Sequence, residues 1–120
     1  MAIKTFREIK AWQLAYQLVL AIYRLTLKFP PHELFGLTAQ LRRAAISIAF
    51  NIAEGYKRNS LADRLRFYNM AETSLEEVKC GLMLAQDLQY ITKNDFEEIF
   101  VVSEECGKVL HGWIVSQQRG

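Results

Sequence analysis

Residues 36–58 read GLTAQLRRAAISIAFNIAEGYKR, a stretch with the length and the unbroken apolar spacing of a single helix. Five polar residues recur in it at spacings of three or four and fall within one strip roughly 80° wide: Gln40, Arg43, Ser47, Asn51 and Glu54. Almost every residue outside this polar strip is apolar, whereas a surface helix of a small monomer needs only one apolar face. The excess predicts a second layer of burial, either deep in a bundle or against another subunit.

The polar strip favours a contact between subunits over a plain solvent-exposed face. Arg43 and Glu54 carry opposite charges on the same side of the helix, but they are eleven residues apart and cannot pair within it. Across an interface each could pair with the other, since a buried charge without a partner is costly. We therefore predict that the five residues of the polar strip form an oligomer interface.

Three more amphipathic helices are expected, because apolar residues recur at helical spacing and no segment alternates as a strand does. The first ends before Pro30, Gly55 is expected to stop the second, and Ser60 and Thr92 are expected to cap the third and fourth. The predicted helices cover about 7–28, 37–54, 60–89 and 93–117. Short connections make neighbours antiparallel, so we predict one all-α domain over residues 1–120, an up-down-up-down four-helix bundle. An open pair of helical hairpins that closes only on oligomerisation is the alternative.

Composition limits the class of protein and its compartment. Of the 120 residues, 51% are apolar and 23% charged, which fits a globular protein and argues against disorder. The start MAIKTFREIK lacks the apolar run of a signal peptide, and no stretch of about 18 apolar residues predicts a membrane span. Cys80 and Cys106 are not a CxxC pair and fit a reducing compartment. We expect a cytoplasmic protein without membrane contact.

Charge is unevenly distributed along the chain although the net charge is only +2. Residues 37–66 carry a net +4 and residues 67–106 a net −7. Such asymmetry is typical of a nucleic-acid surface, of a head-to-tail assembly or of a solvated dipolar bundle.

The basic block 37–66 supplies the candidate nucleic-acid contacts, which are Arg42, Lys57, Arg58, Arg64 and Arg66. Lys57, Arg58 and Arg64 can cluster at one end of the bundle, where they could contact phosphates. Arg42 lies at the start of a helix about 25 Å long, so in a monomer it cannot join that cluster. The alternative is a charged turn that only keeps the bundle hydrated.

Catalytic and metal-binding patterns are missing from the sequence. Neither His32 nor His111 completes the Glu-x-x-His pair of bundle metalloenzymes, and two histidines with two distant cysteines make no zinc set. There is no HExxH, GxSxG or phosphate-binding glycine loop. We predict a protein that is not an enzyme and that holds no metal or other cofactor.

Short motifs along the chain carry a family resemblance. They are FP at 29–30, ELFGLT at 33–38, QLRRAA at 40–45, SI at 47–48 and NIAEG at 51–55, with WQLA at 12–15 and AETSLEE at 71–77. With these motifs the chain resembles a bacterial four-helix-bundle family named after intervening sequences in large-subunit ribosomal RNA genes. Members often have proline where this chain has Ala49, which predicts a straighter second helix here.

The resemblance implies a small cytoplasmic bundle that assembles as a ring-shaped homopentamer. It also implies kinship with the accessory variability determinant of diversity-generating retroelements, which partners a reverse transcriptase and binds nucleic acid; the closing stretch 103–114, with its Gly-Trp pair, resembles that relative's final helix. We therefore expect a non-catalytic homo-oligomeric adaptor that binds structured RNA or an RNA–protein complex. The alternative is a protein-interaction scaffold that partners a reverse transcriptase.

Overall fold

The computed structural model describes residues 2–120 as four long helices with two short 3-10 turns. The helices are α1 (Lys10–Thr26), α2 (Leu37–Lys57), α3 (Leu61–Asp87) and α4 (Lys93–Arg119). The turns are η1 (Phe6–Glu8) and η2 (Pro31–Glu33). Within residues 2–120 there is no β-strand, so the predicted all-α class with four helices is confirmed.

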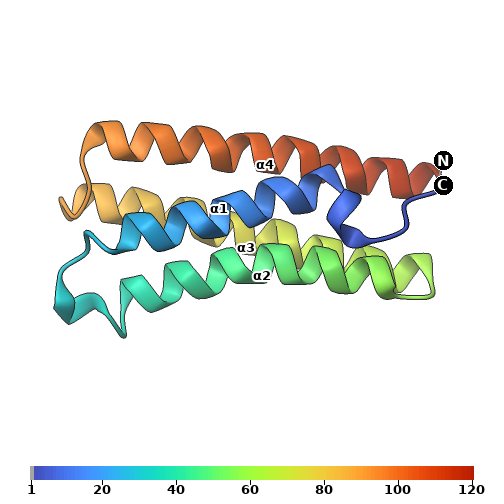
Figure 1. Cartoon of the computed structure of the whole chain (residues 1–120), viewed down its shortest axis with the longest axis horizontal. Helices are drawn as coiled ribbons and strands as arrows, with labels where there is room; N and C mark the ends of the chain where they lie inside the picture. The colour runs from blue at the N-terminus through green and yellow to red at the C-terminus, as the bar shows by residue number, and fades with distance from the viewer. Residues whose placement is uncertain (1) are drawn as a thin grey trace.

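The helices lie side by side along the long axis of a body that measures 45 × 25 × 20 Å (Figure 1). Each helix packs on two others: α1 on α2 and α4, and α3 on α2 and α4. Both chain ends and the α2–α3 turn lie at one end of the bundle, and the α1–α2 and α3–α4 connections lie at the opposite end (Figure 1). This arrangement determines which charged segments become neighbours.

One apolar cluster fills the centre, and all four helices contribute buried side chains to it. On α1 the spacing also predicts core positions for Tyr16 and Tyr23, which is wrong, since these side chains are 49% and 39% exposed. On α2 the fully buried stripe contains Leu41, Ala45, Ile48 and Ile52. The second apolar surface predicted for this helix divides: Ala49 is buried in the core, whereas the Phe50 side chain is 65% exposed. The α2 helix therefore keeps an apolar side chain that packing within the chain does not cover.

Gly55 does not end α2, contrary to the prediction, because the helix continues to Lys57. Gly55 is buried where α2 meets α3, and a Cβ atom there would lie 2.6 Å from Cε1 of the buried Tyr68 ring. The glycine is needed for close approach of two helices rather than for a left-handed turn. The α2 helix is continuous through Ala49.

The first helix begins later than predicted, at Lys10 rather than at residue 7. Thr5 and Glu8 form a capping box around η1, in which the Glu8 carboxylate accepts hydrogen bonds from the backbone N–H groups of Lys4 and Thr5. Ile9 is extended, with φ −75° and ψ 119°, so η1 does not merge with α1. The start of α1 is thus set by this local cap and not by the apolar periodicity.

The third helix ends at Asp87, two residues before its predicted end. Gln89 has a φ of 63° and is the one described residue other than glycine with a positive φ. The N–H of Tyr90 donates to the Ala85 carbonyl and the N–H of Gln89 to the Gln86 carbonyl, both at 2.9 Å. These two bonds define a Schellman motif in which glutamine stands at the usual glycine position.

Candidate nucleic-acid interface

The predicted basic turn forms one end of the bundle, around the connection between α2 and α3. Lys57 is the last residue of α2, Arg58 is its C-cap, and Arg64 and Arg66 follow in the first two turns of α3. Ser60 caps α3, because its side chain accepts a hydrogen bond from the backbone N–H of Asp63 at 3.1 Å. The short turn therefore brings together four of the five predicted contact residues.

Two of these arginines are held in place by aromatic and acidic neighbours. Their guanidinium carbons lie over the Phe67 ring, 4.5 Å from its centroid for Arg58 and 4.6 Å for Arg66. Arg58 also pairs with Glu54 at 3.0 Å, and Arg66 pairs with Asp63 at 2.9 Å. The ring contacts orient the two guanidinium groups, and the ion pairs partly neutralise their charge. A guanidinium stacked on a ring still has N–H donors that point outward.

The other two cations of the turn differ in their surroundings. Arg64 donates from Nε to the Arg58 carbonyl at 2.9 Å and therefore satisfies a carbonyl near the C-terminus of α2. Lys57 is exposed, and among residues 2–120 no carboxylate lies within 4.0 Å of its ammonium. Lys57 thus carries a charge that no carboxylate of the described residues neutralises.

The amino-terminal segment brings further cations that the sequence prediction did not include. The Tyr56 hydroxyl donates to the Ile3 carbonyl at 2.6 Å, which fixes the segment beside the C-terminal turn of α2. A cleft of about 470 Å³ opens between them, lined among others by Lys4, Phe6 and Lys57. In the sequence, the spacing of Thr5 and Glu8 is typical of a capping box and could have predicted an ordered turn here. Only the folded structure shows that this turn lies beside α2.

The resulting surface, here called the basic end, comprises residues 2–10, 54–66 and 116–120. All three segments lie at one end of the bundle (Figure 1). Together they carry eight Lys/Arg and three Asp/Glu, a net +5 on a chain whose net charge is +2. Cations gathered in this way attract the phosphate backbone of nucleic acids.

Arg42 is not part of the basic end. Its Nε donates to the Thr26 hydroxyl at 2.9 Å, and its guanidinium lies 4.6 Å from the centroid of the Tyr23 ring. It joins α1 to α2 in the other half of the bundle. As predicted, Arg42 does not join the cluster of the α2–α3 turn; it packs within the chain against Thr26 and Tyr23.

The polar strip of α2 makes its hydrogen bonds within the chain. Asn51 donates to the Ser47 carbonyl at 2.8 Å, and the Ser74 hydroxyl on α3 donates to the Ser47 hydroxyl at 2.8 Å. Arg43 donates to the Gln40 side chain at 3.0 Å, while Glu54 pairs with Arg58. The middle of the strip thus faces α3, and only its charged ends, Arg43 and Glu54, with Gln40, are exposed.

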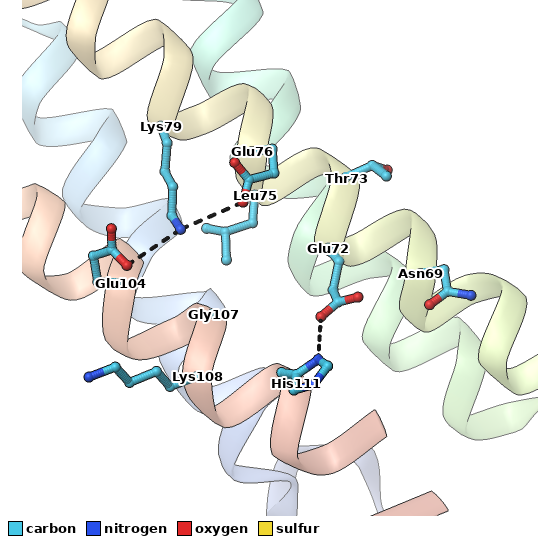
Figure 2. Close-up of a pocket in the computed structure, with 10 residues that line it drawn as sticks. All are labelled: Asn69, Glu72, Thr73, Leu75, Glu76, Lys79, Glu104, Gly107, Lys108 and His111. Carbon is cyan, nitrogen blue, oxygen red and sulfur yellow. Dashed lines mark hydrogen bonds and ion pairs between the residues drawn. The ribbon is translucent and has the colours of Figure 1, made fainter. Parts of the chain in front are cut away.

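A second groove, of about 740 Å³, lies between α3 and α4 and has a different character (Figure 2). In it Lys79 lies between Glu76 and Glu104, at 3.7 and 3.6 Å. His111 contacts Glu72 through Nδ1 at 3.2 Å. The cations and carboxylates neutralise one another across the groove, so it presents neither concentrated charge nor a nucleophile with a base.

The remaining reactive groups do not form a site. Within residues 2–120 no three His, Cys, Asp or Glu side chains gather as metal ligands, and none of the described helices combines the length and apolarity needed to cross a bilayer. Cys106 is buried, and burial raises its pKa to about 11, so it is kept as an unreactive thiol.

Comparison with solved structures identifies a relative with the same architecture. The chain is similar to a protein of unknown function from the S23 ribosomal protein family of Bacteroides thetaiotaomicron, with a TM-score of 0.77 and 26% sequence identity. The likeness covers 87% of this chain and 97% of that one. A search of curated proteins gave no match.

A protein-family model matches residues 7–112, which span α1 to α3 and most of α4. That match confirms the family resemblance predicted from the sequence. The kinship with the accessory variability determinant stays a prediction. The chain belongs to the 23S rRNA-intervening sequence protein family.

Proposed function

We propose that this chain is a non-catalytic, homo-oligomeric adaptor that binds structured RNA, alone or within an RNA–protein complex, through the basic end. The observation that carries the proposal is the net +5 of the three segments that lie at this end. The family name, which refers to 23S rRNA, supports an RNA-related role.

The side chains of the basic end suit phosphate recognition. Arg58 and Arg66 are oriented by the Phe67 ring, and oriented guanidinium groups bind phosphate oxygens through paired donors. Lys57 adds a charge with no carboxylate beside it. Contacts of this kind hold a nucleic acid by its phosphate backbone and do not distinguish one base sequence from another. They fit an RNA that is recognised by its folded shape.

Uncovered apolar side chains support self-association. Along the outer face of α1 they recur at spacings of four and three: Tyr16, Leu20, Tyr23 and Leu27, which are between 39% and 78% exposed. Arg42 lies over Tyr23, and in an antiparallel pair this register places Tyr16 near the level of the exposed Phe50 on α2. A contiguous patch of this kind on a small chain is typical of an interface.

Charge favours a head-to-tail contact over a two-fold one. The α1–α2 side carries Arg24, Arg42 and Arg43 beside the apolar side chains, whereas residues 67–106, in α3 and α4, hold a net −7. Opposite charges on opposite sides of one subunit allow each copy to bind the next, and such heterologous contacts close into rings. The family resemblance gives five subunits as the expected number.

The RNA proposal is tested by removing two positive charges from the basic end. Lys57→Gln with Arg66→Gln should weaken retention of a hairpin RNA about tenfold at moderate salt and reduce the slope of log K against log salt by about two. The control, Lys28→Gln with Lys93→Gln, removes two charges at the other end and should leave both quantities unchanged. Filter binding over a salt series measures them.

Wild-type protein that retains no hairpin RNA at low salt would contradict the proposal. That result would instead favour the scaffold alternative, in which a protein such as a reverse transcriptase is the partner. Equal losses in both double variants would show that overall charge, and not the basic end, is responsible.

The assembly is tested at Phe50, which is exposed beside the charged ends of the polar strip. Phe50→Glu should convert the oligomer to monomer, because it places a charge in an apolar contact. Phe35→Glu makes the same change at a side chain that is 93% exposed in the α1–α2 connection and should not alter the assembly. Arg43→Glu tests the polar strip directly and should weaken the oligomer less. Light scattering after gel filtration gives the mass of each; a monomeric wild type would refute self-association.

A further inference from the structure

The cleft at the basic end has an apolar part as well as a charged part. It occupies about 470 Å³ between η1 and the C-terminal turn of α2, within the range of about 300–1,000 Å³ that is usual for small-ligand clefts. Phe6, Ala53 and Tyr56 form its apolar wall. Phosphate binding needs cations but no such wall, so the function proposed above leaves this feature unexplained.

The aromatic ring in this wall is held in a fixed orientation. The Phe6 ring is half-buried and meets the Trp12 ring edge-on, with centroids 5.0 Å apart and planes at 69°. The Thr5–Glu8 capping box fixes the backbone around it. An aromatic ring that is already oriented loses little conformational freedom when a flat ligand stacks on it.

Cations stand on both sides of the apolar wall. Lys4 and Lys57 line the cleft from opposite segments, and both are exposed. The one carboxylate in the cleft, Glu54, is paired with Arg58 at 3.0 Å, so it does not cancel the two lysines. The Tyr56 hydroxyl is engaged with the Ile3 carbonyl, which leaves its ring as the contact surface.

We propose that this cleft binds an unpaired nucleotide of the RNA, with its base against Phe6 and its phosphate between Lys4 and Lys57. This combination of a positive groove and an aromatic platform is how proteins hold single-stranded nucleic acid. The inference rests on the proposed RNA binding and narrows its substrate class to a helical stem that adjoins a single-stranded segment. The duplex lies on the arginines of the α2–α3 turn, and the first unpaired base enters the cleft.

The test compares a blunt RNA hairpin with the same hairpin carrying a three-nucleotide single-stranded extension. The extension should tighten binding to the wild-type protein about tenfold, since stacking of one base on an aromatic ring is worth about that factor or more. An extension of abasic residues keeps the phosphates and should give no such gain. A 2-aminopurine placed first in the extension should lose fluorescence on binding.

Phe6→Leu should remove base stacking without disturbing the fold, because leucine keeps an apolar contact to Trp12 but has no aromatic face. The gain from the extension should fall below about threefold, while affinity for the blunt hairpin stays unchanged. Phe35→Leu removes an exposed ring at the opposite end of the bundle and should leave the gain intact.

Four outcomes would overturn the inference. An unextended hairpin that binds as tightly as the extended one would overturn it and leave the proposed RNA binding in place. An abasic extension that gives the full gain, or a full gain in Phe6→Leu, would show that no base stacks in this cleft. Failure of the wild-type protein to bind either hairpin would overturn both proposals.

Discussion

The two ends of the bundle have the same helical scaffold but different uses of charge. At the opposite end, Lys28, two residues after the end of α1, pairs with Asp95 in the first turn of α4 at 3.0 Å. Glu33 there accepts hydrogen bonds from the backbone of Leu37 at 2.9 Å and from the Tyr90 hydroxyl at 2.7 Å. Ionic groups at this end connect successive segments to one another.

At the basic end, some positively charged side chains have no carboxylate partner among the described residues. Glu54 and Asp63 pair with Arg58 and Arg66, yet Lys4 and Lys57 have no carboxylate within 4.0 Å among the described residues. Unbalanced like charge stabilises nothing by itself and repels its neighbours. The ionic groups of the opposite end therefore stabilise the fold, whereas the basic end carries positive charge that no carboxylate of the described residues neutralises.

The largest expected effect concerns the close packing of α2 on α3, which glycine permits at both ends. Gly55→Ala should lower the free energy of unfolding by about 1–3 kcal/mol, because the added Cβ would lie 2.6 Å from the buried Tyr68 ring. Gly81→Ala, in the other half of the bundle, meets the Leu41 side chain at the same 2.6 Å. It should cost less, since an aliphatic side chain can change rotamer more easily than a packed aromatic ring.

Gly112→Ala is the matched control for both substitutions. A Cβ there meets nothing within 4 Å, so only helix propensity changes and stability should rise by about 0.5–1 kcal/mol. Urea denaturation of the three variants measures the differences. A neutral Gly55→Ala would show that the Tyr68 contact yields at little cost and that the two ends do not differ in packing.

A smaller effect is expected at the opposite end, at the Schellman motif that closes α3. Gln89→Gly should raise the free energy of unfolding by about 0.5–1 kcal/mol, since Gln89 has a φ of 63° and glycine adopts that conformation without strain. Gln86→Gly places the same residue in the last turn of the helix and should lower stability instead. Loss of stability in Gln89→Gly would mean that its side chain, and not its backbone, decides this connection.

The smallest effect is the pH dependence, which should arise at the opposite end. The hydrogen bond from Lys28 holds the pKa of Asp95 below its ordinary value of 3.8, and the Leu37 N–H holds the pKa of Glu33 below 4.5. Because both folded-state values are lowered, the stabilisation is complete above these ordinary values and is lost as pH falls through the lowered ones.

Denaturation midpoints measured below pH 4.5 should therefore fall with pH in the wild type and fall less steeply in Asp95→Asn and Glu33→Gln. Lys57→Gln, at the basic end, removes no carboxylate and should keep the wild-type slope. An unchanged slope in both Asp95→Asn and Glu33→Gln would show that these two carboxylates do not supply the stabilisation.

Much of the fold could be predicted from periodicity, because α2, α3 and α4 bury most of the stripe that their spacing defines. On α1, Tyr16 and Tyr23 have the spacing of core residues but are exposed. The errors in helix bounds lie where a local interaction outweighs the periodic pattern. The capping box of Thr5 and Glu8 delays α1, and the close approach to Tyr68 lets α2 continue through Gly55. Neither competing interaction is visible in the apolar spacing alone.

The candidate site was predictable only where its residues are close in sequence. Lys57, Arg58, Arg64 and Arg66 are joined by one short turn, so the chain itself keeps them together. Lys4 and Phe6 are some fifty residues away and join them through the Tyr56–Ile3 hydrogen bond. Arg42, although it belongs to the same basic block of the sequence, packs on Tyr23 instead.

The sequence by itself determined the helices, their apolar stripes, the family and the surplus of positive charge in residues 37–66, since these depend on residue type and local spacing. Only the tertiary structure decided which end of the bundle carries that charge and which segment completes it. It also decided that the middle of the polar strip faces α3 while Phe50 faces outward. The physical reason is that antiparallel packing makes neighbours of segments distant along the chain, and no local pattern encodes that proximity.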